Sequence, residues 1–246
     1  MAHVFVADVH AGVRAPRATM AFINFLAAMH SRAETLYLLG DTFDAWLGDD
    51  DVRPPHGEVV HALADLAAAG TRIFAGHGNH DFLLGAAFAE QTGSALLPEV
   101  HRIDLGGRRV VLCHGDELCI DDTDYQAFRA YSRSPENQRA FLSLSLAERA
   151  QEALRLAETS RQAVAHKAHA IMDVNDGAVE EMLIAHDADW LIHGHTHRPK
   201  DHVHHIGDRA RQRFVLGDWF EQESVLVFAD DRLTRVAASE AAGLLG

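Results

Sequence analysis

The sequence contains little cysteine, no long apolar run and no basic leader at its N-terminus. Its two cysteines, Cys113 and Cys119, lack the spacing of a zinc motif, so we expect two buried thiols in a reducing compartment. No stretch approaches the roughly 20 apolar residues that cross a bilayer, so no transmembrane helix is expected. The missing basic leader argues against a signal peptide, and we expect a cytoplasmic protein.

Basic residues are also few in relation to acidic ones. The chain carries 22 Lys and Arg against 36 Asp and Glu, which gives a formal net charge of -14. Such an acidic chain is not expected to take nucleic acid as its partner. An anionic substrate is still compatible with this charge if divalent cations occupy the site, because bound cations dominate the local field. A length of 246 residues allows one domain or two.

Strands and helices alternate through the first third of the chain. The apolar patterns predict three strands, at residues 4–7, 36–39 and 72–75, and two helices, at 17–30 and 58–69. This alternation favours an α/β fold over a β-only barrel. A hairpin is expected at Gly106-Gly107. Further strands are expected at residues 190–192, 202–206, 213–216, 224–228 and 233–236.

The last four of these strands predict an antiparallel closing sheet. Asp230-Asp231 is expected to turn its final hairpin. Residues 237–246 are small and are expected to be loosely held.

Residues 121–170, called the helical insertion below, differ from the rest of the chain. They show no strand pattern, two helical patterns, and seven acidic against seven basic side chains. One helical face collects Leu146, Ala150, Ala153, Ala157, Ser160, Val164 and Lys167. Because Ser160 and Lys167 lie on the face expected to point inward, we interpret the insertion as a cap over the functional site. The alternative is a surface helical hairpin. We therefore expect a single domain, 1–246, with a cap at 121–170 inserted within it.

Five short polar blocks each follow an apolar run that predicts a strand. They are Asp8-Val9-His10, Gly40-Asp41, Gly78-Asn79-His80-Asp81, His114-Gly115-Asp116 and Gly194-His195-Thr196-His197. Residues so far apart in sequence converge only if the fold gathers the strand ends at one edge. On an extended backbone, Asp8 and His10 share a face. Each block alone has an ordinary explanation, such as a turn aspartate or a hydrogen-bonded histidine, but five in order predict one metal centre.

The predicted donors combine carboxylate, imidazole and amide groups without thiolate. That composition suits Mn²⁺, Fe²⁺ or Zn²⁺. Asp41 follows Gly40, which lets the chain turn, so the carboxylate can bridge two ions. Two ions roughly 3.5–4 Å apart hold a hydroxide and clamp a phosphoryl group for in-line displacement. Hydrolysis of a phosphate ester or anhydride is therefore the predicted reaction class.

The ordered blocks resemble those of the calcineurin-like metallophosphoesterases and cover the core from Asp8 to His197. This resemblance implies an α/β fold in which a sandwich of two mixed sheets is flanked by helices. It implies one metal at Asp8, His10, Asp41 and His197 and a second at Asp41, Asn79, His114 and His195.

Longer runs resemble a narrower family, the UDP-2,3-diacylglucosamine pyrophosphatases of lipid A synthesis. The runs lie at 43–51, 81–85, 118–129, 170–175 and 190–199, so the similarity spans nearly the whole chain, including the helical insertion. This resemblance implies cleavage of UDP-2,3-diacylglucosamine to UMP and 2,3-diacylglucosamine 1-phosphate (lipid X). It implies two divalent ions, most often Mn²⁺, and a peripheral position on the cytoplasmic face of the bacterial inner membrane. The matching substrate contacts are Asn79, Asp122, Ser160, Lys167 and His195.

Two positions depart from that narrower family. Val164 stands where a polar residue is usual, and His80 stands where arginine is usual. Arginine would clamp phosphate through a fork of donors, whereas His80 can donate one hydrogen bond or act as an acid near neutral pH. We interpret His80 as serving the same phosphate with fewer contacts; the alternatives are a separate chemical role and a shifted substrate preference. The predicted catalytic set is Asp41, Asn79, His80 and His195.

The helical insertion combines apolar side chains suited to acyl chains with arginines suited to anionic headgroups. The apolar residues are Phe128, Tyr131, Phe141, Leu142, Leu144, Leu146 and Leu154, and the arginines are Arg129, Arg133, Arg139, Arg149, Arg155 and Arg161. Acidic residues between these arginines weaken their attraction to anionic headgroups, so we expect only modest contact with an anionic membrane surface.

Two other functions remain open. One is a phosphodiesterase of a soluble nucleotide, favoured by His80. The other is a non-enzymatic scaffold on the same fold, opposed by the complete ligand set. No pattern in the sequence predicts an oligomeric state.

Overall fold

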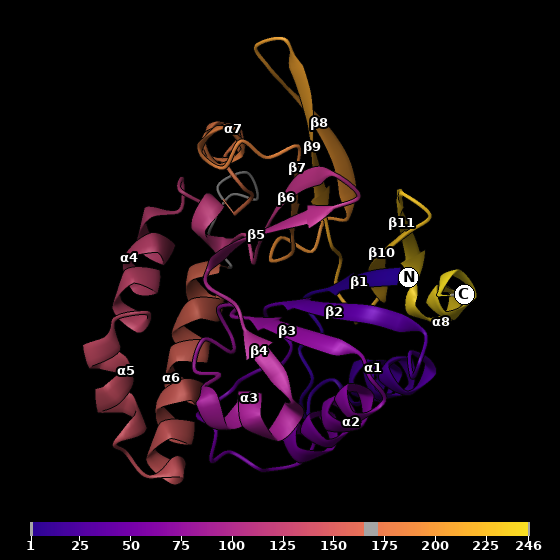
Figure 1. Cartoon of the computed structure of the whole chain (residues 1–246). Coiled ribbons are helices and arrows are strands. Elements are labelled where there is room, and N and C mark those ends of the chain that lie inside the picture. The colour runs from indigo at the N-terminus through magenta and orange to yellow at the C-terminus, as the bar shows by residue number, and fades with distance from the viewer. Residues whose placement is uncertain (1, 165–171, 246) are drawn as a thin grey trace.

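The computed structural model describes residues 2–164 and 172–245, without the side chains at 160, 161, 163 and 164. Within these residues, two β-sheets pack against each other and helices flank them (Figure 1). The first sheet has the order β11-β10-β1-β2-β3-β4, with β1 (Ala2–Val6), β2 (Ala33–Leu39), β3 (Arg72–Gly76), β4 (Ser94–Leu96), β10 (Ser224–Ala229) and β11 (Arg232–Ala237). The second has the order β5-β6-β7-β9-β8, with β5 (Val100–Leu105), β6 (Arg108–Cys113), β7 (Trp190–His193), β8 (Lys200–Ile206) and β9 (Arg209–Val215).

Parallel pairing brings the carboxyl ends of several strands to the same edge. β1 pairs in parallel with β2, and β2 with β3, while β6 and β7 form a parallel pair in the second sheet. The connections in the first sheet contain α1 (Pro16–Ala28), α2 (His56–Ala68) and α3 (Ala86–Thr92). These crossovers confirm the α/β alternation that the sequence predicts.

Alternate side chains along the strands enter different layers of the core. Val4 and Val6 face the layer beneath α1 and α2, whereas Phe5 and Ala7 face the layer between the sheets. Phe5 stacks on Tyr37 with ring centroids 5.0 Å apart. Because both faces of these strands are covered, their sequences are nearly continuous apolar runs rather than alternating ones.

A third apolar layer covers the outer face of the second sheet. There Val111 and Leu191 pack with Val179 of α7 (Asp176–Ala185). The side chain of Asn175 caps this helix by accepting the N–H of Ala178. The two cysteines, Cys113 and Cys119, are free and buried in this layer, as expected. Burial raises the pKa of both thiols, that of Cys119 to about 12.

The helical insertion forms three described helices on one side of the molecule (Figure 1). They are α4 (Thr123–Ser132), α5 (Pro135–Leu142) and α6 (Leu146–Val164), and the turn η1 (Asp116–Leu118) precedes them. The prediction of two helical patterns was wrong, because Pro135 begins a separate helix at its first position. In the chain that is described, no helix is long and apolar enough to cross a membrane.

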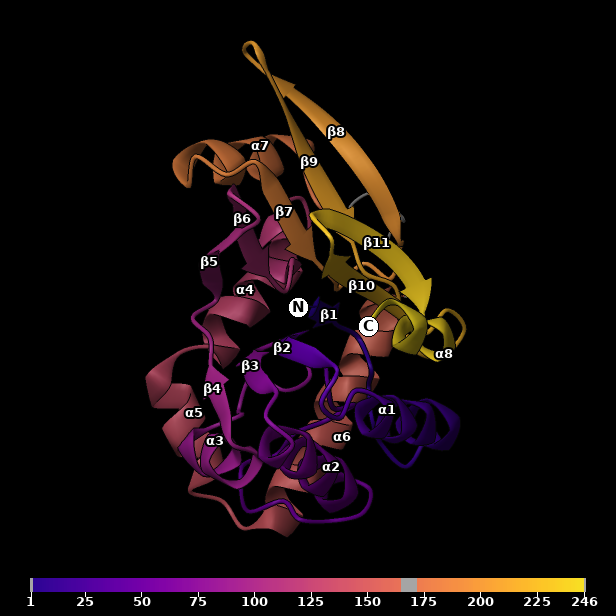
Figure 2. The ribbon, with the colours of Figure 1, turned by 45° about the vertical axis from the view of Figure 1, so that its right-hand side comes forward.

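Two expectations about the end of the chain were wrong. The late strands do not form one closing sheet: β8 and β9 complete the second sheet and project from the body, whereas β10 pairs with β1 in the first (Figure 2). β10 is buried on both faces, because side chains of the core cover each side of it. The C-terminal residues are not loosely held, because Ala241 of α8 (Ala238–Ala241) and Leu245, after η2 (Ala242–Leu244), are buried in the core beside α1.

Candidate metal centre

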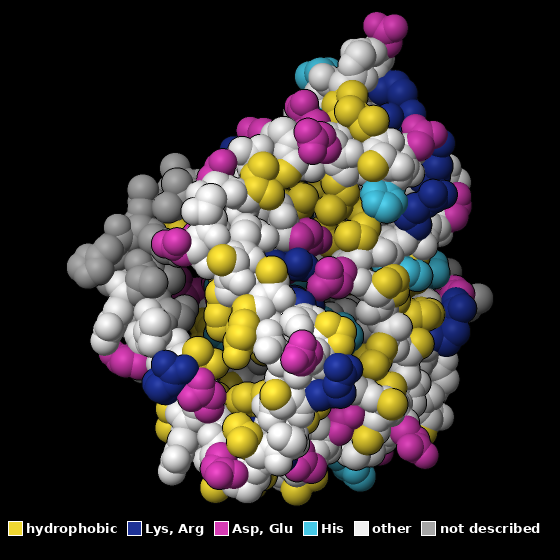
Figure 3. Space-filling view, turned by 90° about the vertical axis from the view of Figure 1, so that its left-hand side faces the viewer, with side chains coloured by type: hydrophobic (Ala, Val, Ile, Leu, Met, Phe, Trp, Pro, Cys, Tyr) yellow, Lys and Arg dark blue, Asp and Glu magenta, His cyan; other side chains and the backbone are white. Residues whose placement is uncertain are grey.

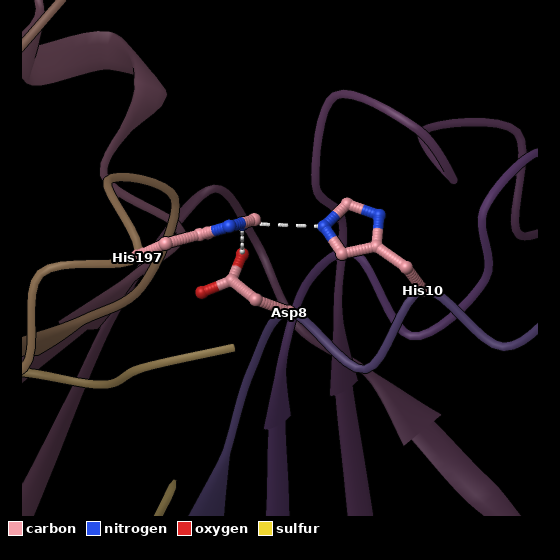
Figure 4. Close-up of side chains that lie close together, drawn as sticks. All are labelled: Asp8, His10 and His197. Carbon is pink, nitrogen blue, oxygen red and sulfur yellow. Dashed lines mark hydrogen bonds and ion pairs between the residues drawn. The ribbon is translucent and has the colours of Figure 1, made fainter. Parts of the chain in front are cut away.

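The five polar blocks meet at one edge of the sandwich. Asp8, Asp41 and Asn79 lie just beyond β1, β2 and β3, and His114 and His195 lie just beyond β6 and β7. Three overlapping groups have ligand atoms within 4.8 Å of one another: Asp8, His10 and His197; His10, Asp41 and His80; and Asp8, Asp41 and His114. Figure 4 shows the first group, in which side chains from two distant segments point toward one another.

The backbone reaches this geometry through left-handed residues. Asp8 and His10 have φ angles of 56° and 49°, and Asp41, His195 and His197 have φ angles of 52°, 66° and 54°. The expectation that Asp8 and His10 share a face of an extended strand was therefore wrong, since β1 ends at Val6. Left-handed non-glycine residues are uncommon and are held where the surrounding structure over-determines them, as at functional sites.

Backbone hydrogen bonds continue past the ends of β1 and β2. The N–H of His10 donates to the carbonyl of Asp41 at 2.9 Å, and the N–H of Ala11 donates to the carbonyl of Thr42 at 2.9 Å. The two ligand-bearing loops are therefore tied to each other and not only to their strands. This pairing fixes the separation of Asp8, His10 and Asp41.

Asp81 fixes the loop after β2 to the loop after β3. Its buried carboxylate accepts four backbone N–H groups, from Gly78, Asp41, Thr42 and Phe43, at 2.7–3.3 Å. Charge-assisted bonds of this kind are strong and directional. Asp81 thus holds Asp41 and Asn79 in register, a role that the sequence reasoning did not assign to it.

Asp41 lies at the centre of the cluster. Its Oδ2 atom is 3.6 Å from Nε2 of His10 and 3.6 Å from Nε2 of His114, and its Oδ1 accepts the backbone N–H of His80 at 2.8 Å. A carboxylate between two imidazoles in this way suits a bridge between two ions. The bridging role of Asp41 stays a prediction.

His114, Asn79 and His195 form one side of the cluster. The Nδ1–H of His114 donates to the carbonyl of Leu39 at 2.9 Å, which leaves Nε2 directed at Oδ1 of Asn79, 3.1 Å away. Oδ1 of Asn79 is also 2.9 Å from Nδ1 of His195. A backbone carbonyl that fixes the tautomer of a histidine is a common outer partner of a metal ligand.

Asp8, His10 and His197 form the other side. Nε2 of His197 is 3.5 Å from Oδ1 of Asp8 and 3.3 Å from Nε2 of His10 (Figure 4). The carboxylate of Asp8 also accepts the backbone N–H of His195 at 2.9 Å. Asp8 therefore joins the first and last polar blocks.

The electrostatics of the cluster favour bound cations. Burial raises the pKa of Asp41 to about 6, and burial lowers that of His195 to about 4. Burial would also lower the pKa of His114, but Asp41, Asp116 and Asp8 outweigh it and raise this pKa to about 9. Among the described residues, every ion pair of Asp8 and Asp41 is with a histidine. Buried carboxylates without Lys or Arg partners, next to imidazole and amide donors, fit divalent metal ions.

Gly40 has a conformation and a position that exclude a side chain. Its φ is 93°, and a Cβ atom there would lie 2.6 Å from the nitrogen of Gly78 and 2.7 Å from Nδ1 of His114. We expect Gly40→Ala to lower the free energy of unfolding by about 3 kcal/mol or more and to weaken metal binding, because the clash displaces the Asn79 loop. Urea unfolding and a Mn²⁺ titration measure the two effects.

Gly70 provides the matched control for that substitution. Its φ is 101°, but a Cβ atom there meets nothing within 4 Å. Gly70→Ala is therefore expected to cost only the backbone strain, about 1–2 kcal/mol, with unchanged Mn²⁺ affinity. Equal effects of the two substitutions would contradict the close approach at Gly40.

The predicted substrate contacts are only partly described. His80 is exposed at the rim of the cluster, where its Nδ1–H donates to the carbonyl of Asp44 at 2.8 Å and its Nε2 lies 4.0 Å from Oδ2 of Asp41. Asp122 is buried and caps α4 by accepting the N–H of Tyr125. The backbone of Ser160 lies in α6, but its side chain and all of Lys167 lie outside the described residues.

Asp116 connects the helical insertion to the metal centre. Its Oδ2 accepts the hydroxyl of Tyr125 at 2.8 Å and Nε–H of Arg129 at 2.9 Å. Arg133 bridges Asp116 and the carbonyl of Gly78, beside Asn79. Its place in the His114-Gly115-Asp116 block could have marked Asp116 as a functional residue, but the sequence alone does not show which residues it pairs with. The insertion thus contacts two of the loops that carry ligands.

Three arginines of the insertion are not placed as the sequence reasoning expected. Arg129 and Arg133 pair with Asp116 and Glu99, and Arg149 is buried against Asp50 and the carbonyl of Leu47. The side chains of these three arginines are at most 15% exposed, so they are not available to lipid headgroups. Their expected role at a membrane surface was therefore wrong.

A buried cluster of carboxylate, imidazole and amide groups at the strand ends of a two-sheet α/β sandwich defines a metal-dependent phosphoesterase. The model of the calcineurin-like phosphoesterases matches residues 1–199. The chain belongs to this family, and the α/β fold with two mixed sheets and flanking helices is confirmed.

Curated relatives extend the match beyond the metal centre. The chain is 45% identical over 232 residues to the UDP-2,3-diacylglucosamine hydrolase of Escherichia coli O6:K15:H31 (strain 536 / UPEC), covering 94% of this chain and 97% of that protein. The same identity and coverage are found with the UDP-2,3-diacylglucosamine hydrolase of Shigella boydii serotype 18. A solved phosphoesterase of E. coli, Yfce, aligns with 98% of this chain and 94% of its own, at 18% identity and a TM-score of 0.49.

Proposed function

We propose that the chain hydrolyses the pyrophosphate bond of UDP-2,3-diacylglucosamine, in the synthesis of lipid A. Water adds to one phosphorus, the bridging P–O bond breaks, and the products are UMP and 2,3-diacylglucosamine 1-phosphate. The observation that carries this proposal is the 45% identity to hydrolases of that name over 94% of the chain, which includes the helical insertion. The gathered ligand set supports the same reaction class.

The seven predicted metal ligands are proposed to hold two divalent ions, and the resemblance of the sequence to the narrower family points to Mn²⁺. When bound, such ions supply a hydroxide at neutral pH and neutralise charge on the phosphoryl group. Asp41 is proposed to bridge the ions. Asn79, His80 and His195 are proposed to orient the attacked phosphate, since all three border Asp41 or each other.

The helical insertion is proposed to bind the rest of the substrate, with Asp122, Ser160 and Lys167 as its polar contacts. Figure 3 shows its side of the molecule, where hydrophobic side chains stand among charged ones of both signs. The exposed large apolar residues of the described insertion are Phe128, Tyr131, Leu142, Leu144 and Leu154. Apolar surface next to a polar centre suits a lipid with two acyl chains.

The same exposed residues are proposed to place the chain on the cytoplasmic face of the bacterial inner membrane as a peripheral protein. Leu154 and Tyr131 are the most exposed of them, at 67% and 62%. With three arginines engaged inside the protein, apolar contact is the larger contribution in this proposal.

The proposed function is tested by UMP release from micellar UDP-2,3-diacylglucosamine with Mn²⁺, beside hydrolysis of bis(p-nitrophenyl) phosphate. We expect kcat/KM for the lipid to exceed that for the soluble diester by at least about 100-fold, since only the lipid engages the insertion. A preference for the soluble diester would favour a nucleotide phosphodiesterase. Absence of metal-dependent hydrolysis of both would indicate a scaffold.

His80 gives a sharper test of the phosphate contacts. We expect His80→Ala to lower kcat/KM for the lipid substrate by about 10- to 100-fold, because a donor to the phosphate is lost. His80→Arg is expected to raise it above the wild-type value, because a guanidinium donates a fork of hydrogen bonds. Steady-state kinetics of UMP release measures both. Loss of turnover in His80→Arg would instead give the imidazole a chemical role of its own.

A further inference from the structure

The loop between β9 and β10 presents an aromatic ring to solvent beside the metal centre. Phe220 is 55% exposed, and its ring stacks on that of His10 with centroids 5.6 Å apart and an angle of 21° between the planes. Trp219, its neighbour in the chain, is fully buried under α1. The loop therefore buries one large aromatic side chain and exposes the next at the site.

Three backbone hydrogen bonds and the packing of one indole ring hold this loop in place. The N–H of Trp219 donates to the carbonyl of Asp8, and Oδ1 of Asp218 accepts the N–H groups of Phe220 and Glu221, both at 2.9 Å. The indole of Trp219 packs edge-on against Phe22 and Phe25. These contacts and the stacking on His10 place the exposed ring of Phe220 beside the metal centre without a ligand, as a preorganised binding platform requires.

Phe220 and the helical insertion lie on different sides of Asp41. The insertion reaches the His195 side, where the ring of Tyr125 lies 5.8 Å from that of His195, and Arg133 donates to the carbonyl of Gly78. Phe220 contacts His10, on the other side of Asp41. A substrate whose phosphates lie at Asp41 would therefore have the helical insertion on one side and the ring of Phe220 on the other.

We propose that Phe220 is a specificity-determining residue whose ring stacks on the nucleobase of the substrate. This inference rests on the proposed function, because it assigns the acylated sugar to the insertion and the uridine to the opposite side. A planar base can stack on an aromatic side chain. Replacing such a side chain with alanine typically weakens the affinity for the base by about 5- to 150-fold. Of the two arms of the substrate, only the base is flat.

Calorimetric titration of UMP and of ribose 5-phosphate into the Mn²⁺-loaded protein tests this assignment. Both probes carry ribose and a phosphate monoester, but only UMP carries a base. We expect the wild type to bind UMP about tenfold more tightly than ribose 5-phosphate. In Phe220→Leu this ratio is expected to fall to about one through weaker UMP binding alone, and in Phe220→Tyr, which keeps the ring, the ratio is expected to persist.

Two results would overturn the inference. A UMP preference that survives in Phe220→Leu would show that the base binds elsewhere. Equal weakening of both probes would show that Phe220 supports His10 rather than a base. UMP release from the lipid substrate by the wild type is measured in parallel, so that failure of the proposed function is distinguished from failure of this assignment.

Discussion

Replacing Asp41 with alanine is expected to lower Mn²⁺-dependent hydrolysis by at least about 1,000-fold. Asp41 faces both halves of the cluster, with Oδ2 at 3.6 Å from Nε2 of His10 and 3.6 Å from Nε2 of His114. Without its carboxylate, the two histidine groups lose the anion between them, and two cations at that spacing repel each other without compensation. Initial rates of UMP release at saturating Mn²⁺ measure the loss.

An exposed aspartate gives the control for this substitution. Asp65 lies on α2, and its side chain is 57% exposed beside His61. Asp65→Ala removes the same charge from the chain and is expected to leave the rate within about twofold. UMP release that survives Asp41→Ala at more than about a tenth of the wild-type rate would contradict the bridging role.

Replacing Asp81 with alanine is expected to lower the free energy of unfolding of the metal-free protein by about 3–5 kcal/mol. Four backbone N–H groups donate to this buried carboxylate, and alanine would leave them without an acceptor. Metal affinity is expected to fall as well, since the same N–H groups belong to the loops that carry Asp41 and Asn79. Urea unfolding in the presence of a chelator measures the stability without the contribution of bound metal.

Asp81→Asn separates the number of acceptors from the volume of the side chain. The amide keeps one oxygen but turns an NH₂ group toward backbone donors, so this variant is expected to be destabilised almost as much as Asp81→Ala. Asp65→Ala again serves as the exposed control, with an expected change within about 0.5 kcal/mol. A change in Asp81→Ala no larger than that of the control would contradict the anchoring role.

The sequence predicts the members of the metal cluster because strand ends have a recognisable pattern. A run of apolar residues predicts a buried strand. A polar block directly after that run lies near the edge of the sheet, whichever conformation the loop adopts. The parallel order of β1, β2 and β3 then brings Asp8, Asp41 and Asn79 together. This argument needs only the approximate position of each strand, which an apolar run indicates, and not its last residue.

The local backbone of the site could not be predicted in the same way. Nothing in a run such as Asp8-Val9-His10 signals two left-handed residues, because their strain is outweighed by contacts with distant segments. The hydrogen bond from Trp219 to the carbonyl of Asp8 is one such contact, made across more than 200 residues of chain. Tertiary contacts, rather than local preference, set these angles.

Sheet membership and the partners of buried charges were also out of reach. β8 and β10 are both short strands of the C-terminal region, and only their pairing with neighbouring strands assigns them to different sheets. Arginine is usually a surface residue, but in this fold Arg133 pairs with Asp116 and Arg149 pairs with Asp50. Long-range pairing of this kind leaves no periodic signal in the sequence.

An anomalous difference map of crystals grown with Mn²⁺ tests the central claim most directly. We expect two manganese peaks per chain, about 3.5–4 Å apart, with the carboxylate of Asp41 between them. Asp8, His10 and His197 should surround one peak, and Asn79, His114 and His195 the other. A single peak, or manganese bound away from these seven side chains, would contradict the two-metal account.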